Sequence, residues 1–223
     1  MGWLSEALGS SIGKKFVMAV TGIGLILFLI FHLVGNFTLY GGPEAFNGYV
    51  ETLEVVKPLV RVIEVGLALV FIFHIYNGIK LWLENRKARP TKYKISAESK
   101  NSSFFSRFMV QTGSIVFIFL VLHLATFWWL FNFSGEPHEK GEAYYAIVVE
   151  WFQIEWYAIF YVIAVILLGF HLNHGFQSAF QTFGWNHNKY FPWIEKIGSA
   201  YAIIMALGFA SFPIYFLFFY GGN

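Results

Sequence analysis

The chain has 223 residues, of which 57% are hydrophobic and 13% are charged, with a formal net charge of +2 and a mean hydropathy of +0.57. Soluble domains carry about 25% charged residues, so this composition indicates an integral membrane protein. The small net charge gives no reason to expect a nucleic-acid partner. The absence of cysteine excludes disulfides, iron–sulfur ligation by this chain and cofactors attached through thioethers.

Five apolar runs are long enough to cross a bilayer, which takes about 20 residues each. We therefore predict an all-α integral membrane protein with five transmembrane helices and a single domain over residues 1–223. The first run is too long for a cleaved signal peptide, so we expect it to be a span. The predicted spans cover residues 16–40, 59–83, 108–131, 156–183 and 197–220.

The distribution of basic residues predicts the orientation of the chain. Lys14 and Lys15 precede the first span, and seven further lysines and arginines lie between residues 84 and 107. Basic residues next to spans stay in the cytoplasm, so the N-terminus is expected on that side of a multi-pass protein of the bacterial inner membrane. Two acidic segments, residues 44–57 and 134–155, then lie outside.

Each of the first four predicted spans carries histidine in its apolar interior, and these histidines fall at two depths. His32 and His123 each lie 8 residues before the outer end of their span, roughly 12 Å inside it at 1.5 Å per residue. His74, and His171 or His174, lie roughly 14–18 Å from the inner end. Ionisable groups are costly in lipid, so four such positions suggest a function.

Histidines at matching depth on facing helices can be the two axial ligands of one haem, and the core of a helix bundle is a common place for a cofactor. We therefore predict that the first four helices form a haem-binding bundle with an outer and an inner site. A single histidine in a span is often a helix–helix hydrogen bond, but four paired by depth weigh against that interpretation. A metal-ion site is disfavoured because no carboxylate lies near the inner pair. Gly35, Gly78 and Gly175 each lie one turn after a histidine, where we expect them to admit a flat macrocycle.

With the histidines placed, the chain resembles the dihaem cytochrome b558-type membrane subunit of succinate dehydrogenase and fumarate reductase, the succinate:quinone oxidoreductases. The resemblance covers nearly the whole chain through five spans and the order of four short motifs. These are Ser10-Ser11-Ile12-Gly13-Lys14-Lys15, Phe31-His32-Leu33-Val34-Gly35-Asn36, Phe73-His74-Ile75-Tyr76-Asn77-Gly78 and Phe170-His171-Leu172-Asn173-His174-Gly175.

The resemblance implies a respiratory-chain anchor that links the tricarboxylic acid cycle to a quinone, expected to be menaquinone. Two b haems in this chain would pass electrons between the quinone and two cytoplasmic partners, a flavoprotein with FAD and an iron–sulfur protein. The complex could form a higher oligomer. His32 and His123 would ligate the distal haem, and His74 and His171 the proximal one. Depth slightly favours His174 as the fourth ligand, whereas the family pattern favours His171.

The family places its quinone near the distal haem, where a carboxylate is the natural proton carrier. Glu44, Glu51 and Glu64 are the candidates, although Glu64 can equally form an i, i+3 ion pair with Arg61. Candidate contacts to haem propionates are Ser11, Lys80 and Arg107, and His174 if it is not a ligand. The direction of the reaction stays open.

Two alternatives remain at this point. A cytochrome b561-like electron carrier also pairs histidines from four consecutive helices but usually has six spans. A transporter whose histidines relay protons belongs to a different functional class.

Overall fold

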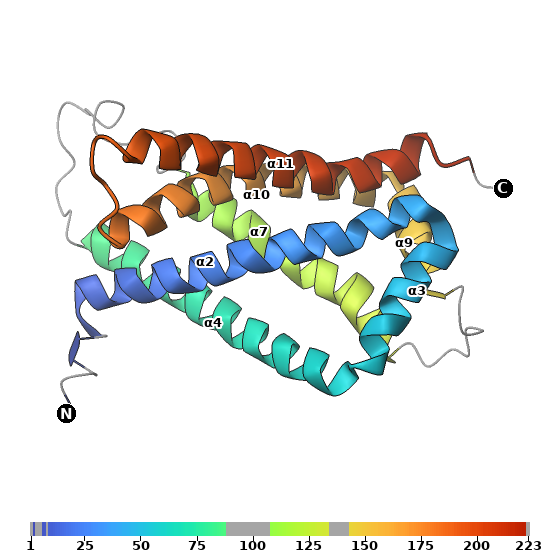
Figure 1. Ribbon diagram of the computed structural model, residues 1–223, viewed down its shortest axis with the longest axis horizontal. Coiled ribbons are helices and arrows are strands. Elements are labelled where there is room, and N and C mark those ends of the chain that lie inside the picture. Colours follow the sequence, from blue (N-terminus) through green and yellow to red (C-terminus); the bar gives the residue numbers. More distant parts are fainter. Residues whose placement is uncertain (1, 3–5, 8, 88–107, 134–142, 222–223) are drawn as a thin grey trace. The chain divides into compact units, whose positions relative to one another are not determined.

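The computed structural model describes residues 2, 6–7, 9–87, 108–133 and 143–221. These residues form helices and contain no strand, which confirms the predicted all-α class. Five helical segments among them are long and apolar enough to cross a membrane. Figure 1 shows the helices, coloured along the chain.

The long helices begin or end a few residues away from the predicted span limits. The first, α2, covers Ser11–Asn36, so Lys14 and Lys15 are helical instead of preceding the helix. The remaining long helices are α4 (Lys57–Lys87), α7 (Met109–His123), α10 (Glu155–Thr182) and α11 (Phe191–Phe218). At 1.5 Å per residue, the 26 residues of α2 extend about 39 Å, which exceeds a hydrocarbon core of about 30 Å.

The chain separates into two compact units, and all five long helices contribute residues to both. The first unit comprises residues 1–28, 64–113 and 170–202, and the second comprises residues 29–63, 114–169 and 203–223. One histidine pair belongs to each unit: His74 and His171 to the first, His32 and His123 to the second.

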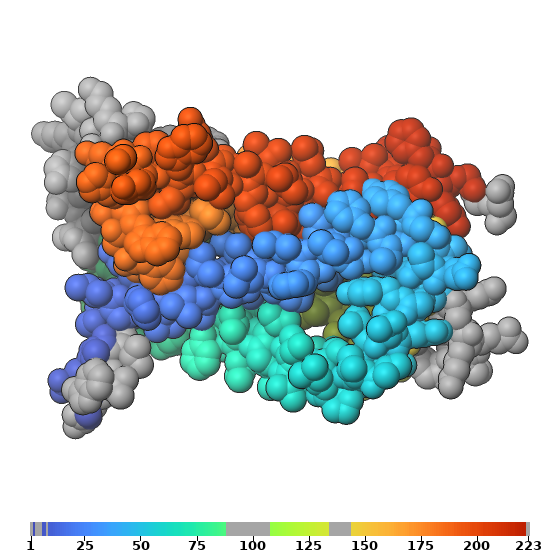
Figure 2. Space-filling view, viewed as in Figure 1, coloured from blue at the N-terminus to red at the C-terminus, as the bar shows by residue number. Residues whose placement is uncertain are grey.

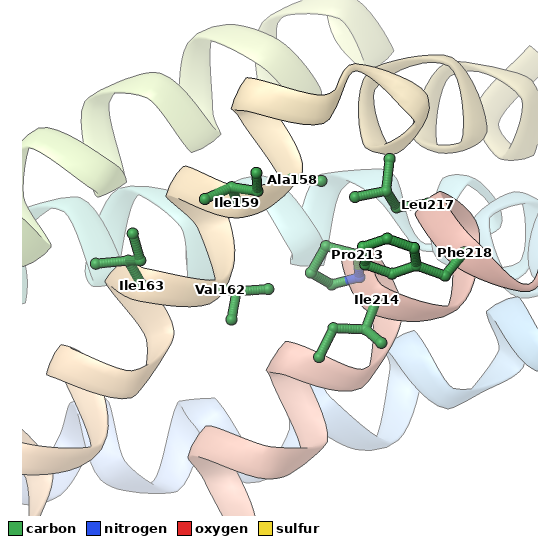
Figure 3. Close-up of a pocket in the computed structure, with 8 residues that line it drawn as sticks. All are labelled: Ala158, Ile159, Val162, Ile163, Pro213, Ile214, Leu217 and Phe218. Carbon is green, nitrogen blue, oxygen red and sulfur yellow. The ribbon is translucent and has the colours of Figure 1, made fainter.

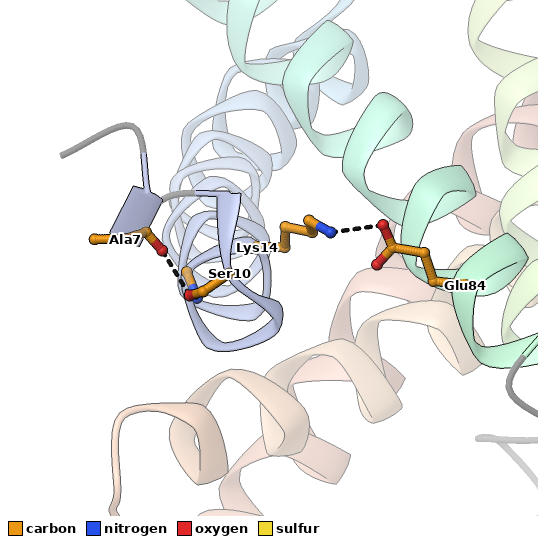
Figure 4. Close-up of polar contacts among 5 residues, drawn as sticks. Ala7, Ser10, Lys14 and Glu84 are labelled. Atoms are coloured by element: carbon orange, nitrogen blue, oxygen red, sulfur yellow. Dashed lines mark hydrogen bonds and ion pairs between the residues drawn. The ribbon is translucent and has the colours of Figure 1, made fainter. Parts of the chain in front are cut away.

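Polar contacts organise one end of α2 in the first unit. Ser10 caps the helix, because its hydroxyl oxygen accepts a hydrogen bond from Gly13 N (3.0 Å) and its hydroxyl donates to Ala7 O (2.6 Å). Lys14 Nζ lies 2.6 Å from Glu84 Oε1 on α4, as Figure 4 shows. This ion pair fixes the first turn of α2 against the last turns of α4.

Close packing between α10 and α11 in the first unit depends on a glycine. A Cβ atom on Gly198 would lie 2.7 Å from Phe176 Cδ1, so only glycine lets that ring approach the α11 backbone. Ser199 Oγ donates to Asn173 Oδ1 at 3.1 Å beside this contact. Small residues and interhelical hydrogen bonds of this kind are what hold helices together in lipid.

The third predicted span is not one uniform α-helix. A π-helical turn, η2 (Leu124–Trp128), begins directly after His123 at the end of α7, and α8 (Trp129–Phe133) follows it. Single π-helical turns inside α-helices are frequently found at functional sites. Thr126 and Phe127 of this turn are buried in the second unit.

The two acidic segments were predicted only as polar connections, but each contains a short helix. After a 3₁₀ turn, η1 (Phe37–Gly41), Gly42 adopts φ +80° at the start of α3 (Gly42–Val55). The second short helix, α9 (Ala143–Gln153), lies between α8 and α10 in the chain. Asn47 of α3 is 2% exposed, and its Oδ1 accepts a hydrogen bond from Tyr145 N at 2.9 Å. This buried contact ties α3 to α9.

Many large apolar side chains of the long helices point away from the protein. On α4, for example, Val62, Ile72 and Phe73 are each more than half exposed, and Figure 2 shows α4 side chains (teal) at the visible surface. Water-soluble proteins rarely expose apolar area on this scale, so these surfaces are suited to contact with lipid.

Candidate functional site

The structure brings four of the predicted haem ligands together as two pairs. In the first unit, the ring centroids of His74 and His171 lie 6.3 Å apart at an interplanar angle of 66°. In the second unit, those of His32 and His123 lie 5.7 Å apart at 87°. All four side chains are half-buried.

These distances fit the axial ligation of one iron atom by each pair. Imidazole nitrogen binds metals at about 2.0 Å, so two axial nitrogens lie about 4 Å apart and the ring centroids about 6 Å apart. Each ring can turn about its own metal–nitrogen bond, so both interplanar angles are compatible with this arrangement. Each pair offers two nitrogen ligands. Within the described ranges, no group of three or more histidine, cysteine or carboxylate side chains could hold a metal ion.

One histidine of each pair has a hydroxyl partner on Nδ1. His74 Nδ1 lies 3.2 Å from Thr21 Oγ1 of α2, and His123 Nδ1 lies 2.8 Å from the Tyr161 hydroxyl of α10. Histidine that ligates a metal through one nitrogen normally donates the other N–H to such a partner. These contacts leave Nε2 of His74 and His123 as the nitrogen for a metal. Neither Thr21 nor Tyr161 was predicted from the sequence.

Histidine 171, not His174, faces the partner histidine of the first unit. His171 Nδ1 is buried and has no hydrogen-bond partner in the part of the chain that the structure describes. His174 lies one turn further along α10 and is half-buried.

The glycines that lie close to the imidazoles are different from those predicted. A Cβ on Gly22 would lie 3.5 Å from His74 Cε1, and one on Gly113 would lie 3.3 Å from His171 Cε1. Each of these glycines lies on a helix next to the histidine's own, which is why spacing along a single helix did not reveal them. Gly22 precedes His32 by ten residues, which puts it near the depth of the inner pair. This depth is the feature of the sequence from which its position beside His74 could have been predicted.

Gly35 and Gly78, which were predicted to admit a macrocycle, lie against protein side chains. A Cβ on Gly35 would lie 2.7 Å from Tyr49 Cζ, and one on Gly78 would lie 3.1 Å from Met18 Cε. Both glycines therefore make room for protein side chains. Gly175 has open space, with nothing within 4 Å of its Cβ position.

The candidate quinone-site carboxylates lie in two helices. Glu44 and Glu51 are exposed on α3, in the second unit, whereas Glu64 is half-buried in α4 and belongs to the first unit. Arg61, the alternative ion-pair partner considered for Glu64, donates to Asn132 Oδ1 at 2.6 Å and lies over the Trp128 ring.

A further carboxylate, Glu54, was not singled out from the sequence. It accepts a hydrogen bond from Lys57 Nζ at 2.8 Å, near the end of α3. The Tyr144 phenol of α9 has a raised pKa because of partial burial and, secondarily, the nearby Glu54 carboxylate. Glu54, Lys57 and Tyr144 thus form a polar cluster in the second unit.

The predicted propionate contacts have different surroundings. Lys80 Nζ lies 5.6 Å from the centroid of the Tyr76 ring. Ser11 is the exposed first residue of α2. Arg107 lies outside the described residues.

An apolar groove of about 170 Å³ lies between α10 and α11 in the second unit (Figure 3). Its eight lining residues, including Val162, Pro213 and Leu217, are all apolar. The groove offers no group that could ligate a metal or carry a proton, so the histidine pairs are the centre of the candidate site.

Comparison with known proteins assigns the chain to a family. The sequence model of the succinate dehydrogenase/fumarate reductase transmembrane subunit matches residues 16–101, a stretch that contains His32 and His74. No solved structure matches the chain.

A named relative supports the same family. The succinate dehydrogenase hydrophobic membrane anchor subunit of Halobacterium salinarum is 33% identical over 96 residues, which are 43% of this chain and 67% of the relative. Together with five helical segments suited to crossing a membrane, this similarity shows that the chain belongs to the family of succinate dehydrogenase/fumarate reductase transmembrane subunits.

Proposed function

We propose that this membrane subunit binds two b haems and passes electrons between cytoplasmic iron–sulfur and flavin subunits and a quinone, expected to be menaquinone. The observation that carries the proposal is the pairing of four membrane histidines at 6.3 Å and 5.7 Å. Haem iron, when bound, supplies a one-electron couple, and ligation by two histidines closes the iron to other ligands.

The residues of this chain would hold the cofactors and fix their orientation. His74 and His171 would ligate the haem nearer the cytoplasm, and His32 and His123 the haem nearer the opposite face. Gly22 and Gly113 leave space beside the imidazoles of the first unit, since an added methyl group would contact them at 3.5 and 3.3 Å. Membership of the family supports this function over a cytochrome b561-like carrier or a histidine-relay transporter.

Quinone chemistry also needs a proton carrier, and α3 supplies exposed carboxylates for it. Glu51 and Glu44 would exchange protons between their carboxylate oxygens and water, while Glu64 is the more enclosed candidate. The basic residues at the ends of α2 and α4, with Lys14 paired to Glu84, would face the cytoplasm and the partner subunits.

The test is to purify the complex and record a reduced-minus-oxidised spectrum before and after adding a quinol. We expect b-type haem bands that the quinol reduces, together with a copurifying flavin subunit. Glu51→Gln should slow quinone turnover with both haems retained, whereas Glu150→Gln, at another exposed carboxylate of the second unit, should not. Absence of b-type bands from the intact complex would refute the haem assignment.

A further inference from the structure

We infer that Thr21 and Tyr161 are positioning residues, one for each histidine pair, whose hydroxyl oxygens accept hydrogen bonds from Nδ1–H of His74 and His123. The inference deepens the proposed function and rests on it. Neither residue is a predicted haem ligand. Each would fix the orientation of one ligand imidazole and so influence the reduction potential of one haem.

The direction of the hydrogen bond between Thr21 and His74 is assigned from the donors and acceptors around the Thr21 hydroxyl. A threonine hydroxyl has one proton and two acceptor lone pairs. Thr21 Oγ1 lies 2.8 Å from Val17 O and 3.1 Å from Met18 O, carbonyls of its own helix that can only accept. We therefore assign the hydroxyl proton to these carbonyls of α2 and the contact at 3.2 Å to donation from His74 Nδ1–H to Thr21 Oγ1.

This direction fixes the tautomer of His74. A neutral imidazole carries one N–H, so a proton on Nδ1 leaves Nε2 with a free lone pair. That nitrogen is the one available to iron. The chain thus prepares His74 as a ligand before any cofactor is present.

Burial and ring contacts restrict the position of the Tyr161 side chain. It is 8% exposed, and its ring makes edge contacts with Phe119 at 4.6 Å and Phe152 at 4.9 Å. Its hydroxyl lies 2.8 Å from His123 Nδ1. If Nε2 ligated iron, Nδ1 would carry the proton and the phenol oxygen would accept a hydrogen bond from Nδ1–H. Phe119 also stacks on His123 at 5.7 Å, which restricts the same imidazole from its face.

The two contacts have a measurable electronic consequence. A ligand imidazole that donates its outer N–H is a more basic ligand and stabilises the oxidised iron. Removing the acceptor should therefore raise the reduction potential of that haem. Because Thr21 and Tyr161 belong to different units, each removal should affect one haem and spare the other.

The experiment is a redox titration of the haem bands in the full chain, purified within its complex, with electron paramagnetic resonance of the oxidised haems as a second readout. The variants are Tyr161→Phe and Thr21→Val, with His32→Ala and His74→Ala identifying the bands. We expect Tyr161→Phe to raise only the potential of the His32–His123 haem and Thr21→Val only that of the His74–His171 haem.

Matched variants separate this effect from a structural one. Tyr157→Phe removes the hydroxyl of a buried tyrosine one turn before Tyr161 on α10, and Thr112→Val removes one that bonds carbonyls of its own helix. Both should leave the potentials unchanged. Thr21→Ser keeps the hydroxyl and should show the haem potentials of the unmodified protein. Together with Thr21→Val it tests the inference at the His74–His171 pair even if Tyr161→Phe does not accumulate.

The outcomes distinguish the inference from the function on which it rests. An unmodified complex without haem would refute the proposed function. An unmodified complex with two haems, in which the Thr21 and Tyr161 variants shift neither potential or shift both equally, would refute the positioning role alone.

Discussion

At the residue scale, the chain offers two histidines one turn apart on α10, and the structure distinguishes between them. His171 lies with its ring centroid 6.3 Å from that of His74, within the range for two ligands of one iron atom. His171 is therefore the better candidate for the ligand.

Replacing these two histidines separately tests that choice. His171→Ala should remove the haem of the first unit, because only one axial ligand would remain. His174→Ala should retain it. Haem content per chain, measured as the pyridine haemochrome, checks both variants, and retention in His171→Ala with loss in His174→Ala would reassign the ligand.

The glycine beside His171 permits a second test with a matched control. In Gly113→Ala the new methyl group would lie 3.3 Å from His171 Cε1, so the imidazole must shift by a few tenths of an ångström. We expect an altered resonance signal and weaker retention of that haem, even though alanine favours a helix by about 1 kcal/mol. Gly66→Ala, with nothing within 4 Å of the added methyl group, should leave the haem unchanged. Equal effects of the two substitutions would show that the contact at Gly113 is unimportant.

Residue types and depths along the helices were enough to predict which histidines pair, but not what surrounds them. Thr21 and Tyr161 are ordinary residues in apolar runs, and only the three-dimensional packing brings their hydroxyls to His74 and His123. The backbone of Gly35 lies against Tyr49 of α3, and no spacing within α2 reveals that contact.

At the element scale, apolar run length predicted the five long helices because backbone groups in lipid must be satisfied within the segment. It did not predict the π-helical turn after His123, since one extra residue in a turn leaves composition unchanged. It also did not reveal that α3 and α9 are helices joined through Asn47, because that contact links residues 98 positions apart.

Packing of α11 against α10 provides a prediction at this scale. Gly198→Ala would bring a methyl group to 2.7 Å from Phe176 Cδ1, with Cγ and Cβ of the same ring residue also close. Overpacking of this kind costs about 1–3 kcal/mol, so the thermal stability of the detergent-solubilised protein should fall. Gly66→Ala, with nothing within 4 Å, is the control and should be neutral or stabilising. A loss of stability in the control alone would contradict the packing account.

At the scale of the whole molecule, the absence of cysteine makes the proposed orientation simple to test. Lys87→Cys, at the end of α4, should be protected from a membrane-impermeant maleimide in intact cells and react after permeabilisation. Glu51→Cys, exposed on α3, should react in both conditions. Labelling of the unmodified chain provides the background, and the reverse pattern would place the N-terminus outside.

The central claim is that two independent histidine pairs each ligate one b haem. The most direct measurement is haem content per chain in the purified unmodified protein and in the His32→Ala, His74→Ala and doubly substituted variants. The account predicts two haems, then one with each single substitution, with different spectra remaining, and none with both. A single haem in the unmodified protein, or loss of both haems from either single substitution, would contradict it.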